Sequence, residues 1–143
     1  VSVCFSKGLG APAGSALVGS KALIAKAKRV RKMAGGTMRQ AGVLAAAALH
    51  ALEHHIDRLA EDHARARRLA DGLHGLPGLR VQAPQTNMVF IDLPRERAAA
   101  IVATLRAQGV LATGLYQLRL VTHLDVDDAG VDHAIAVLRD ALH

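Results

Sequence analysis

The segment 41–52 limits what this chain can fold into more than any other part of the sequence. It is rich in alanine and, once wound into a helix, it is apolar on nearly every side. A helix without a polar face needs neighbours over most of its surface, and alanine lets those neighbours approach the backbone closely. The segment therefore predicts a helix buried on most of its faces, which a chain of 143 residues rarely achieves alone.

The composition suits one soluble domain or part of one. Hydrophobic residues make up 51% and aromatic residues only 2%, so we expect a core of Ala, Val, Leu and Ile. A single Cys cannot form an internal disulfide, which favours a reducing, cytoplasmic location. The longest uncharged stretch, 40–52, is shorter than the about 20 residues that a membrane-spanning helix needs. With no leader sequence evident, no membrane segment is expected.

Charge divides the chain at the end of the apolar segment. The first acidic residue is Glu53; eight basic residues precede it, and the rest of the chain holds ten basic and twelve acidic residues. This excess suggests an anionic partner, whether a phosphate group, nucleic acid or an acidic surface, although a solvated helix face over 21–32 would look the same. Nucleic acid is not expected, because Phe5 is the only aromatic residue available there for stacking. We predict two parts, 1–52 and 53–143.

Local patterns predict a mixed order of strands and helices. Ser20 is a suitable N-cap for a basic helix, which Gly35 and Gly36 should end. The second part reads as a small α+β layer. The expected strands are 1–5, 16–18, 79–82, 88–93, 110–113 and 118–122, and the expected helices are 21–33, 38–52, 56–73, 95–108 and 127–142. The inner face of helix 56–73 should comprise Ile56, Leu59, Ala60, His63, Ala66, Ala70 and Leu73.

Lys7 is the first candidate for chemistry. It stands where the apolar run 1–5 meets a loop rich in glycine and proline. Apolar walls around its amine would lower the pKa of the lysine and leave a neutral nucleophile. By position alone, a solvated lysine beside a turn is the favoured interpretation.

Five short motifs follow one another in an order and spacing that resemble low-specificity threonine aldolase. The resemblance covers essentially the whole chain and implies a pyridoxal-phosphate (PLP) enzyme of fold type I. The fold class expected is α/β and α+β, with 1–52 as the end of the large cofactor-binding domain and 53–143 as the small C-terminal domain. The motifs are Ser6-Lys7-Gly8-Leu9-Gly10-Ala11-Pro12, Arg31-Lys32-Met33, Gly35-Gly36-Thr37-Met38-Arg39-Gln40-Ala41-Gly42, Thr86-Asn87-Met88-Val89-Phe90 and Arg119-Leu120-Val121-Thr122-His123.

The resemblance implies a role for four basic residues. Lys7 matches the lysine that holds the cofactor covalently and acts in catalysis. Arg119 matches the arginine that binds the substrate carboxylate, a task that suits a planar fork of donors. Arg39 matches an arginine expected near the cofactor phosphate, and Lys32 matches a lysine near the same site that contacts the substrate. The implied reaction cleaves L-threonine or L-allo-threonine into glycine and acetaldehyde.

The resemblance also implies that the chain is a C-terminal fragment. Family members place more than half of their length before the cofactor lysine, including the ring-stacking histidine, the aspartate at the pyridine nitrogen, the main phosphate loop and a second carboxylate-binding arginine. That part, or a second subunit of an expected tetramer, would cover helix 41–52. The isolated chain should then expose apolar surface and self-associate. Thr37 replaces a usual third glycine, which would strain the loop if φ is positive there.

Three alternatives remain beside the aldolase interpretation. Another PLP lyase of fold type I would share these motifs. A non-catalytic basic module would use 21–32 to bind nucleic acid or an acidic partner, with an affinity that falls steeply with salt. The third is a zinc hydrolase, because His50-Ala51-Leu52-Glu53-His54 fits an inverted zinc-peptidase pattern. We expect no metal, since His54, His55, His63 and His74 are typical of surface or interface helix residues.

Overall fold

The computed structural model describes residues 1–142, which form two compact units. The first unit is Val1–Leu59 and the second begins at Ala60. This boundary between the units lies shortly after the charge boundary at Glu53. The assignment of 1–52 to a large domain and of 53–143 to a small one stays a prediction.

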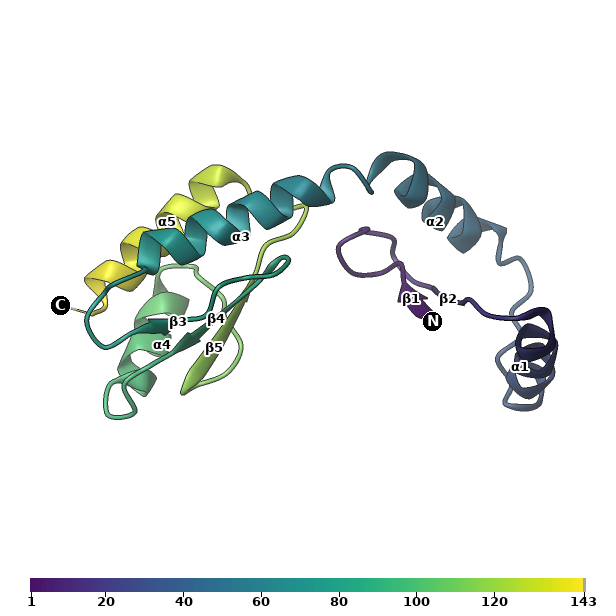
Figure 1. Ribbon diagram of the computed structural model, residues 1–143, viewed down its shortest axis with the longest axis horizontal. Helices are drawn as coiled ribbons and strands as arrows, with labels where there is room; N and C mark the ends of the chain where they lie inside the picture. The colour runs from purple at the N-terminus through teal and green to yellow at the C-terminus, as the bar shows by residue number, and fades with distance from the viewer. Residues whose placement is uncertain (143) are drawn as a thin grey trace. The chain divides into compact units, whose positions relative to one another are not determined.

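The first unit contains the short strands β1 (Ser2–Cys4) and β2 (Ser15–Leu17) and the helices α1 (Lys21–Met33) and α2 (Gly42–His54), which can be followed in Figure 1. Strands β1 and β2 are antiparallel, with Val3 opposite Ala16. Helix α1 begins as predicted, because the Ser20 hydroxyl accepts a hydrogen bond from the Leu23 amide at 3.2 Å. It ends at Ala34, before Gly35 with φ of 76°.

Helix α2 (Gly42–His54) differs from its prediction in two ways. It begins at Gly42 rather than near Met38, because the chain bends just before it, where Gln40 has φ of 49°. Its burial is also lower than expected: only Ala51 is fully buried, while Val43 is 79% and Leu49 is 55% exposed. The other elements of this unit cover α2 only in part, so the apolar exposure expected of the chain is present.

The second unit is a three-stranded antiparallel sheet with helices on one face. Strands β3 (Arg80–Val81), β4 (Met88–Asp92) and β5 (Gln117–Val121) lie in the order β3-β4-β5. Val89 lies opposite Leu120, and Ile91 lies opposite Leu118. All four of these side chains are buried, so one face of the sheet meets the core and the intervening residues face the other way.

Helices α3 (Leu59–Leu73), α4 (Ala98–Ala107) and α5 (Asp128–Asp140) complete this core, and α3 and α5 lie side by side (Figure 1). The buried face of α3 differs from the prediction: Ile56 and Ala60 are exposed, whereas Leu69 and Asp62 are buried. The Thr122 hydroxyl donates a hydrogen bond to the Asp62 carbonyl oxygen at 2.7 Å, which holds this turn against the end of β5. The predicted positions Ala66, Ala70 and Leu73 are buried in the core, so the apolar spacing located most of the face within 66–73 and was wrong at the two exposed positions before it.

The strand predicted at 110–113 does not form. Within residues 1–142 this segment makes one isolated bridge, between Thr113 and Arg119. The segment begins by closing α4, since the Val110 amide donates to the Leu105 carbonyl oxygen at 2.8 Å and the Val110 side chain enters the core. The other elements of this unit confirm the predicted order, with ends that differ by a few residues.

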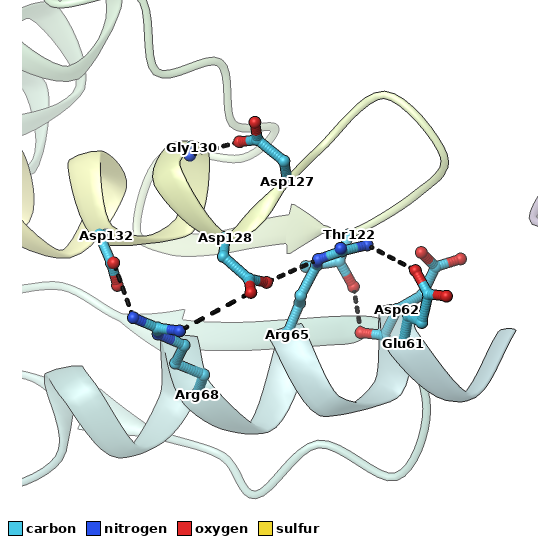
Figure 2. A network of polar contacts seen from close by, with 9 residues as sticks. All are labelled: Glu61, Asp62, Arg65, Arg68, Thr122, Asp127, Asp128, Gly130 and Asp132. Atoms are coloured by element: carbon cyan, nitrogen blue, oxygen red, sulfur yellow. Dashed lines mark hydrogen bonds and ion pairs between the residues drawn. The ribbon is translucent and has the colours of Figure 1, made fainter. Parts of the chain in front are cut away.

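Ion pairs join α3 to α5 on the surface, as Figure 2 shows. Arg65 Nε lies 2.8 Å from Asp128 Oδ1, and Arg68 Nη2 lies 2.7 Å from Asp132 Oδ2. The hydrogen bond to Asp128 raises the pKa of the Arg65 guanidinium above its ordinary value. Asp127 caps α5 by accepting from the Gly130 amide at 2.8 Å. Since exposed pairs contribute little energy, this network mainly orients the two helices. Every helix in residues 1–142 is too short or too polar to span a bilayer.

Candidate functional site

Lys7 lies in a closed loop that joins β1 to β2. The Phe5 amide donates to the Gly14 carbonyl oxygen at 3.0 Å, and the Ala11 amide donates to the Phe5 carbonyl oxygen at 3.0 Å. A tight turn starts at Lys7 itself, whose carbonyl oxygen accepts from the Gly10 amide at 2.8 Å. Gly10 has φ of 72° and Gly14 has φ of 116°. The glycine-rich sequence is thus needed because the chain must turn sharply on both sides of Ala11, which is buried.

A histidine at the C-cap of α2 anchors the same loop. The ring of His55 places Nδ1 2.7 Å from the Leu9 carbonyl oxygen, in a partly buried position. A carbonyl oxygen only accepts, so Nδ1 carries the hydrogen of this bond. The ring packs edge-on against that of His50, with centroids 5.4 Å apart. The sequence interpretation treated His55 as a surface or interface residue and missed this function, because its partner lies 46 residues away.

The Lys7 amine is exposed and unpaired. It makes no hydrogen bond or ion pair within residues 1–142, and no apolar walls of this part enclose it. Its charge does act on a neighbour: hydrogen bonds from Ser6 lower the pKa of the Cys4 thiol, and the nearby positive charge of Lys7 lowers it further. The loop therefore presents a free primary amine on a backbone that is fixed by hydrogen bonds.

Lys32 and Arg39 lie on either side of the turn between α1 and α2. Lys32 is in the last turn of α1, and Arg39 is in the bend before α2. Both side chains are exposed and have no hydrogen-bond or ion-pair partner in the part of the chain that the structure describes. Thr37 has no positive φ, so the strain that its replacement of glycine suggested is absent. The left-handed residues between α1 and α2 are Gly35 and Gln40.

Arg119 lies in the middle of β5, in the second unit. It stands opposite Phe90 in the register, on the sheet face that points away from the core. The guanidinium is exposed and has no hydrogen-bond or ion-pair partner among residues 1–142. By contrast, Arg65, Arg68, Arg97 and Arg139 of the same unit all make ion pairs or hydrogen bonds.

Hydrogen bonds between Asn87 and Thr122 join the start of β4 to the end of β5, and both residues belong to the sequence motifs. The Asn87 side-chain amide donates to the Thr122 carbonyl oxygen at 2.9 Å, and the Thr122 amide donates to the Asn87 carbonyl oxygen at 3.0 Å. Thr122 is 2% exposed, which makes it one of two buried polar side chains in the described part of the chain. No role was predicted from the sequence for either residue. A polar residue next to an apolar strand was the signal that could have indicated one.

The histidines at the end of α2 lie close together. The rings of His50 and His54 have centroids 4.4 Å apart. Among residues 1–142, however, no group of three His, Cys, Asp or Glu side chains is arranged to hold a metal ion. The zinc-peptidase interpretation of this motif needs a third ligand, and nothing in the described residues supplies one.

Comparison with known protein families gives a match over about two thirds of the chain. The model of the Beta-eliminating lyase family matches residues 1–96, which includes the Lys7 loop, both helices of the first unit and strands β3 and β4. Arg119 lies outside the matched residues.

Curated relatives match most or all of the chain. A probable low-specificity L-threonine aldolase 2 of Arabidopsis thaliana is 41% identical over 150 residues, covering 100% of this chain and 42% of the relative. A low specificity L-threonine aldolase of Escherichia coli (strain K12) is 48% identical over 124 residues, covering 87% of this chain and 37% of the relative. The chain thus spans less than half the length of the curated relatives it matches.

A solved structure shares the fold. It is a protein from Exiguobacterium sp. 255-15, provisionally described as an aromatic amino acid beta-eliminating lyase/threonine aldolase. The superposition has a TM-score of 0.75 at 22% identity, and it covers 98% of this chain and 44% of the other. The fold of nearly the whole chain is therefore shared with less than half of a longer chain.

Proposed function

The chain belongs to the Beta-eliminating lyase family, and from this premise we propose that it is the C-terminal part of a PLP-dependent threonine aldolase. The enzyme would cleave L-threonine or L-allo-threonine into glycine and acetaldehyde. The fold is that of the C-terminal part of a fold-type-I PLP enzyme, as expected. The observation that carries the proposal is the free amine of Lys7, held on a fixed loop in a motif that resembles the cofactor site of this family.

The residues of the first unit fit the cofactor chemically. An exposed, unpaired lysine amine is available for a covalent bond to an aldehyde, and exposed cations at Lys32 and Arg39 suit a phosphate group. When bound, PLP supplies an electron sink for the bond that breaks at Cα of the substrate. We assign Lys7 to covalent attachment and catalysis, Arg39 to the cofactor phosphate, and Lys32 to the substrate near the same site.

Arg119 is our candidate for the substrate carboxylate. A planar guanidinium with no internal partner can donate two parallel hydrogen bonds to a carboxylate, which fixes the amino acid in orientation as well as in position. An arginine already paired with Asp or Glu would have to break that pair first. This difference supports Arg119 over Arg65 or Arg68 of the same unit.

The complete enzyme would be a cytoplasmic homo-oligomer, expected to be a tetramer, with an amino acid as its small-molecule substrate. The exposed apolar side chains of α2, including Val43 and Leu49, support the expectation that further protein covers this helix. A ring-stacking histidine, an aspartate for the pyridine nitrogen and the main phosphate loop would come from that further protein.

The first test is covalent capture of the cofactor by the chain. Purified chain is titrated with PLP, reduced with borohydride and mapped by peptide mass spectrometry. We expect one adduct per chain, at Lys7, and its loss in Lys7→Arg, whereas the matched variant Lys21→Arg should label like the parent. Labelling spread evenly over the exposed lysines would contradict a site at Lys7.

The second test separates aldol cleavage from the alternatives. We would build a chimera in which this chain replaces the matching C-terminal segment of the E. coli relative, and supply L-threonine. Aldol cleavage breaks the Cα–Cβ bond and releases glycine and acetaldehyde, whereas a β-eliminating lyase acting on threonine would release 2-oxobutanoate and ammonia. Formation of 2-oxobutanoate alone would replace our proposal with the sibling lyase.

A basic binding module makes a different prediction. All of α1 lies at the surface, with no fully buried residue, so its lysines are accessible to an acidic partner. Binding through them would weaken steeply with salt and would not depend on Lys7. An inactive chimera, combined with salt-sensitive binding of an acidic polymer that Lys7→Arg leaves intact, would favour this alternative.

A further inference from the structure

On the outer edge of β5, the backbone of Arg119 is hydrogen-bonded to Thr113, on the side away from the neighbouring strand β4. Its amide donates to the Thr113 carbonyl oxygen at 2.8 Å, and its carbonyl oxygen accepts from the Thr113 amide at 3.3 Å. Both backbone groups of Arg119 therefore point away from β4. The opposite residue agrees with this, because the Phe90 carbonyl oxygen accepts from Gln82 of the β3 side at 2.9 Å. In residues 1–142, Thr113 is thus the sole backbone partner of Arg119.

From this geometry we propose that Thr113 and Gly114 are positioning residues for the carboxylate-binding guanidinium of Arg119. The inference rests on the proposed function, in which Arg119 binds the substrate carboxylate. Because the guanidinium has no hydrogen-bond or ion-pair partner in the described residues, the point from which it extends is fixed by the backbone that carries it. The bridge to Thr113 supplies that support on the side where β5 has no neighbouring strand.

Gly114 makes the bridge possible. The chain must reverse between Thr113 and Arg119 within a short loop, and Gly114 does so with φ of 95°, a region that favours glycine. A Cβ at this position would collide with the Gln117 carbonyl oxygen and lie 3.1 Å from its carbonyl carbon. Backbone atoms cannot move aside as a side chain would, so any other residue should displace Thr113 from Arg119.

The far arm of the loop is held independently. The Leu93 amide donates to the Tyr116 carbonyl oxygen at 2.8 Å, and the Gln117 side-chain amide donates to Asp92 Oδ1 at 2.7 Å. These bonds keep the start of β5 on β4 without help from Gly114. A change at Gly114 is therefore expected to release Thr113 and the outer side of Arg119 while the β4–β5 ladder remains.

The structural half of the test compares two glycines that share a positive φ. Gly75 has φ of 76° and open space around it, so Gly75→Ala reproduces the backbone cost of a side chain without the collision. Amide hydrogen exchange of the 143-residue chain is followed by NMR. In Gly114→Ala the Arg119 amide should exchange about tenfold faster or more, with the Leu120 amide unchanged. Equal protection of Arg119 in the two variants would overturn the proposal.

A second variant covers the case in which Gly114→Ala does not fold. Thr113→Pro removes the amide that donates to Arg119 and adds no atom near Gln117. The Thr113 carbonyl oxygen, which accepts from the Arg119 amide, remains in this variant, so exchange at Arg119 should rise by less than in Gly114→Ala. Unchanged exchange at Arg119 would contradict a bridge whose two bonds support each other.

The functional half uses the chimera with the E. coli relative. Gly114→Ala should raise KM for L-threonine about fivefold or more with kcat within about twofold, because carboxylate binding weakens while the chemistry is untouched. Combined with Arg119→Lys, it should add no further loss, as for residues that act through one another. Additive losses, or a fall in kcat alone, would overturn the positioning role. If the parent chimera is inactive while the exchange difference persists, the proposed function has failed and the bridge has not.

Discussion

His55 and Leu9 join helix α2 to the loop that carries Lys7, through a hydrogen bond from Nδ1 to the carbonyl oxygen at 2.7 Å. The loop contains three further backbone bonds, two at Phe5 and one at Lys7, and among its side chains that of Ala11 is buried. The bond from His55 is a side-chain hydrogen bond between the end of α2 and this loop, so it contributes to holding the loop in place.

Replacing this histidine should loosen the lysine loop. His55→Phe keeps a ring of similar size but removes the donor, which leaves the Leu9 carbonyl oxygen without its partner. We expect faster amide exchange at Gly10 and Ala11 and a loss of about 1 kcal/mol in local stability, the usual net contribution of one hydrogen bond. The neighbouring variant His54→Phe, which removes no hydrogen bond of the described chain, is the control. Exchange that is equally slow in both variants would argue against the anchor.

The thiol of Cys4 should react at unusually low pH. Its Sγ lies 3.2 Å from the Ser6 hydroxyl, and hydrogen bonds from Ser6, aided by the charge of Lys7, lower its pKa. A lowered pKa means that the reactive thiolate persists further below the ordinary titration range. The midpoint of iodoacetamide alkylation against pH should therefore rise in Ser6→Ala and, by less, in Lys7→Gln. An unchanged midpoint in Ser6→Ala would contradict this account.

Thr122 should stabilise the second unit far more than an exposed threonine does. Its buried hydroxyl donates to the Asp62 carbonyl oxygen, and its backbone pairs with Asn87. Thr122→Val removes the donor, leaves a buried carbonyl without that partner, and should lower the free energy of unfolding by about 1–3 kcal/mol in urea titrations followed by circular dichroism. Thr104→Val, at an exposed position of α4, should change it by less than about 0.5 kcal/mol.

Gly72 should resist enlargement because α3 and α5 approach closely there. A Cβ at this position would lie 2.5 Å from Ile135 Cδ1 and 3.2 Å from Ile135 Cγ2. Overpacking of this kind costs about 1–3 kcal/mol, against roughly 1 kcal/mol that alanine gains over glycine inside a helix. Gly72→Ala should be destabilising on balance, and Ile135→Val, which removes Cδ1, should reduce its effect. Purely additive changes in the double variant would show that the two residues do not touch.

Where structure follows from neighbours in the chain, the sequence predicted it well. Ser20 and Gly35 bound α1 through a local cap and a local turn, and Asp127 caps α5 in the same way. Apolar alternation likewise located β4 and β5, because one face of each strand meets the core.

Features that depend on distant partners were out of reach. Residues 110–113 have the composition of a strand, but only Thr113 finds a partner because the loop from Gly114 turns the chain back. On α3 the apolar spacing correctly predicted Ala66, Ala70 and Leu73 in the core. The bond from the Thr122 hydroxyl to the Asp62 carbonyl oxygen joins residues 60 apart and had no local signal. Among the candidate site residues, Lys7, Lys32, Arg39 and Arg119 were named by motif, while the contacts that hold their backbones, from His55 and Thr113, left no local signal.

The apolar surface of α2 should drive self-association of the chain. Val43 is 79% exposed on a helix with few charged residues, whereas Leu111 of the second unit is 78% exposed as a single side chain in a loop. Both positions can be changed to lysine without loss of a buried contact. Val43→Lys should lower the binding of a hydrophobic dye and the sedimentation coefficient at high concentration, and Leu111→Lys should leave both unchanged. If Leu111→Lys had the larger effect, the association surface would lie in the second unit, and α2 would not be the face that needs a cover.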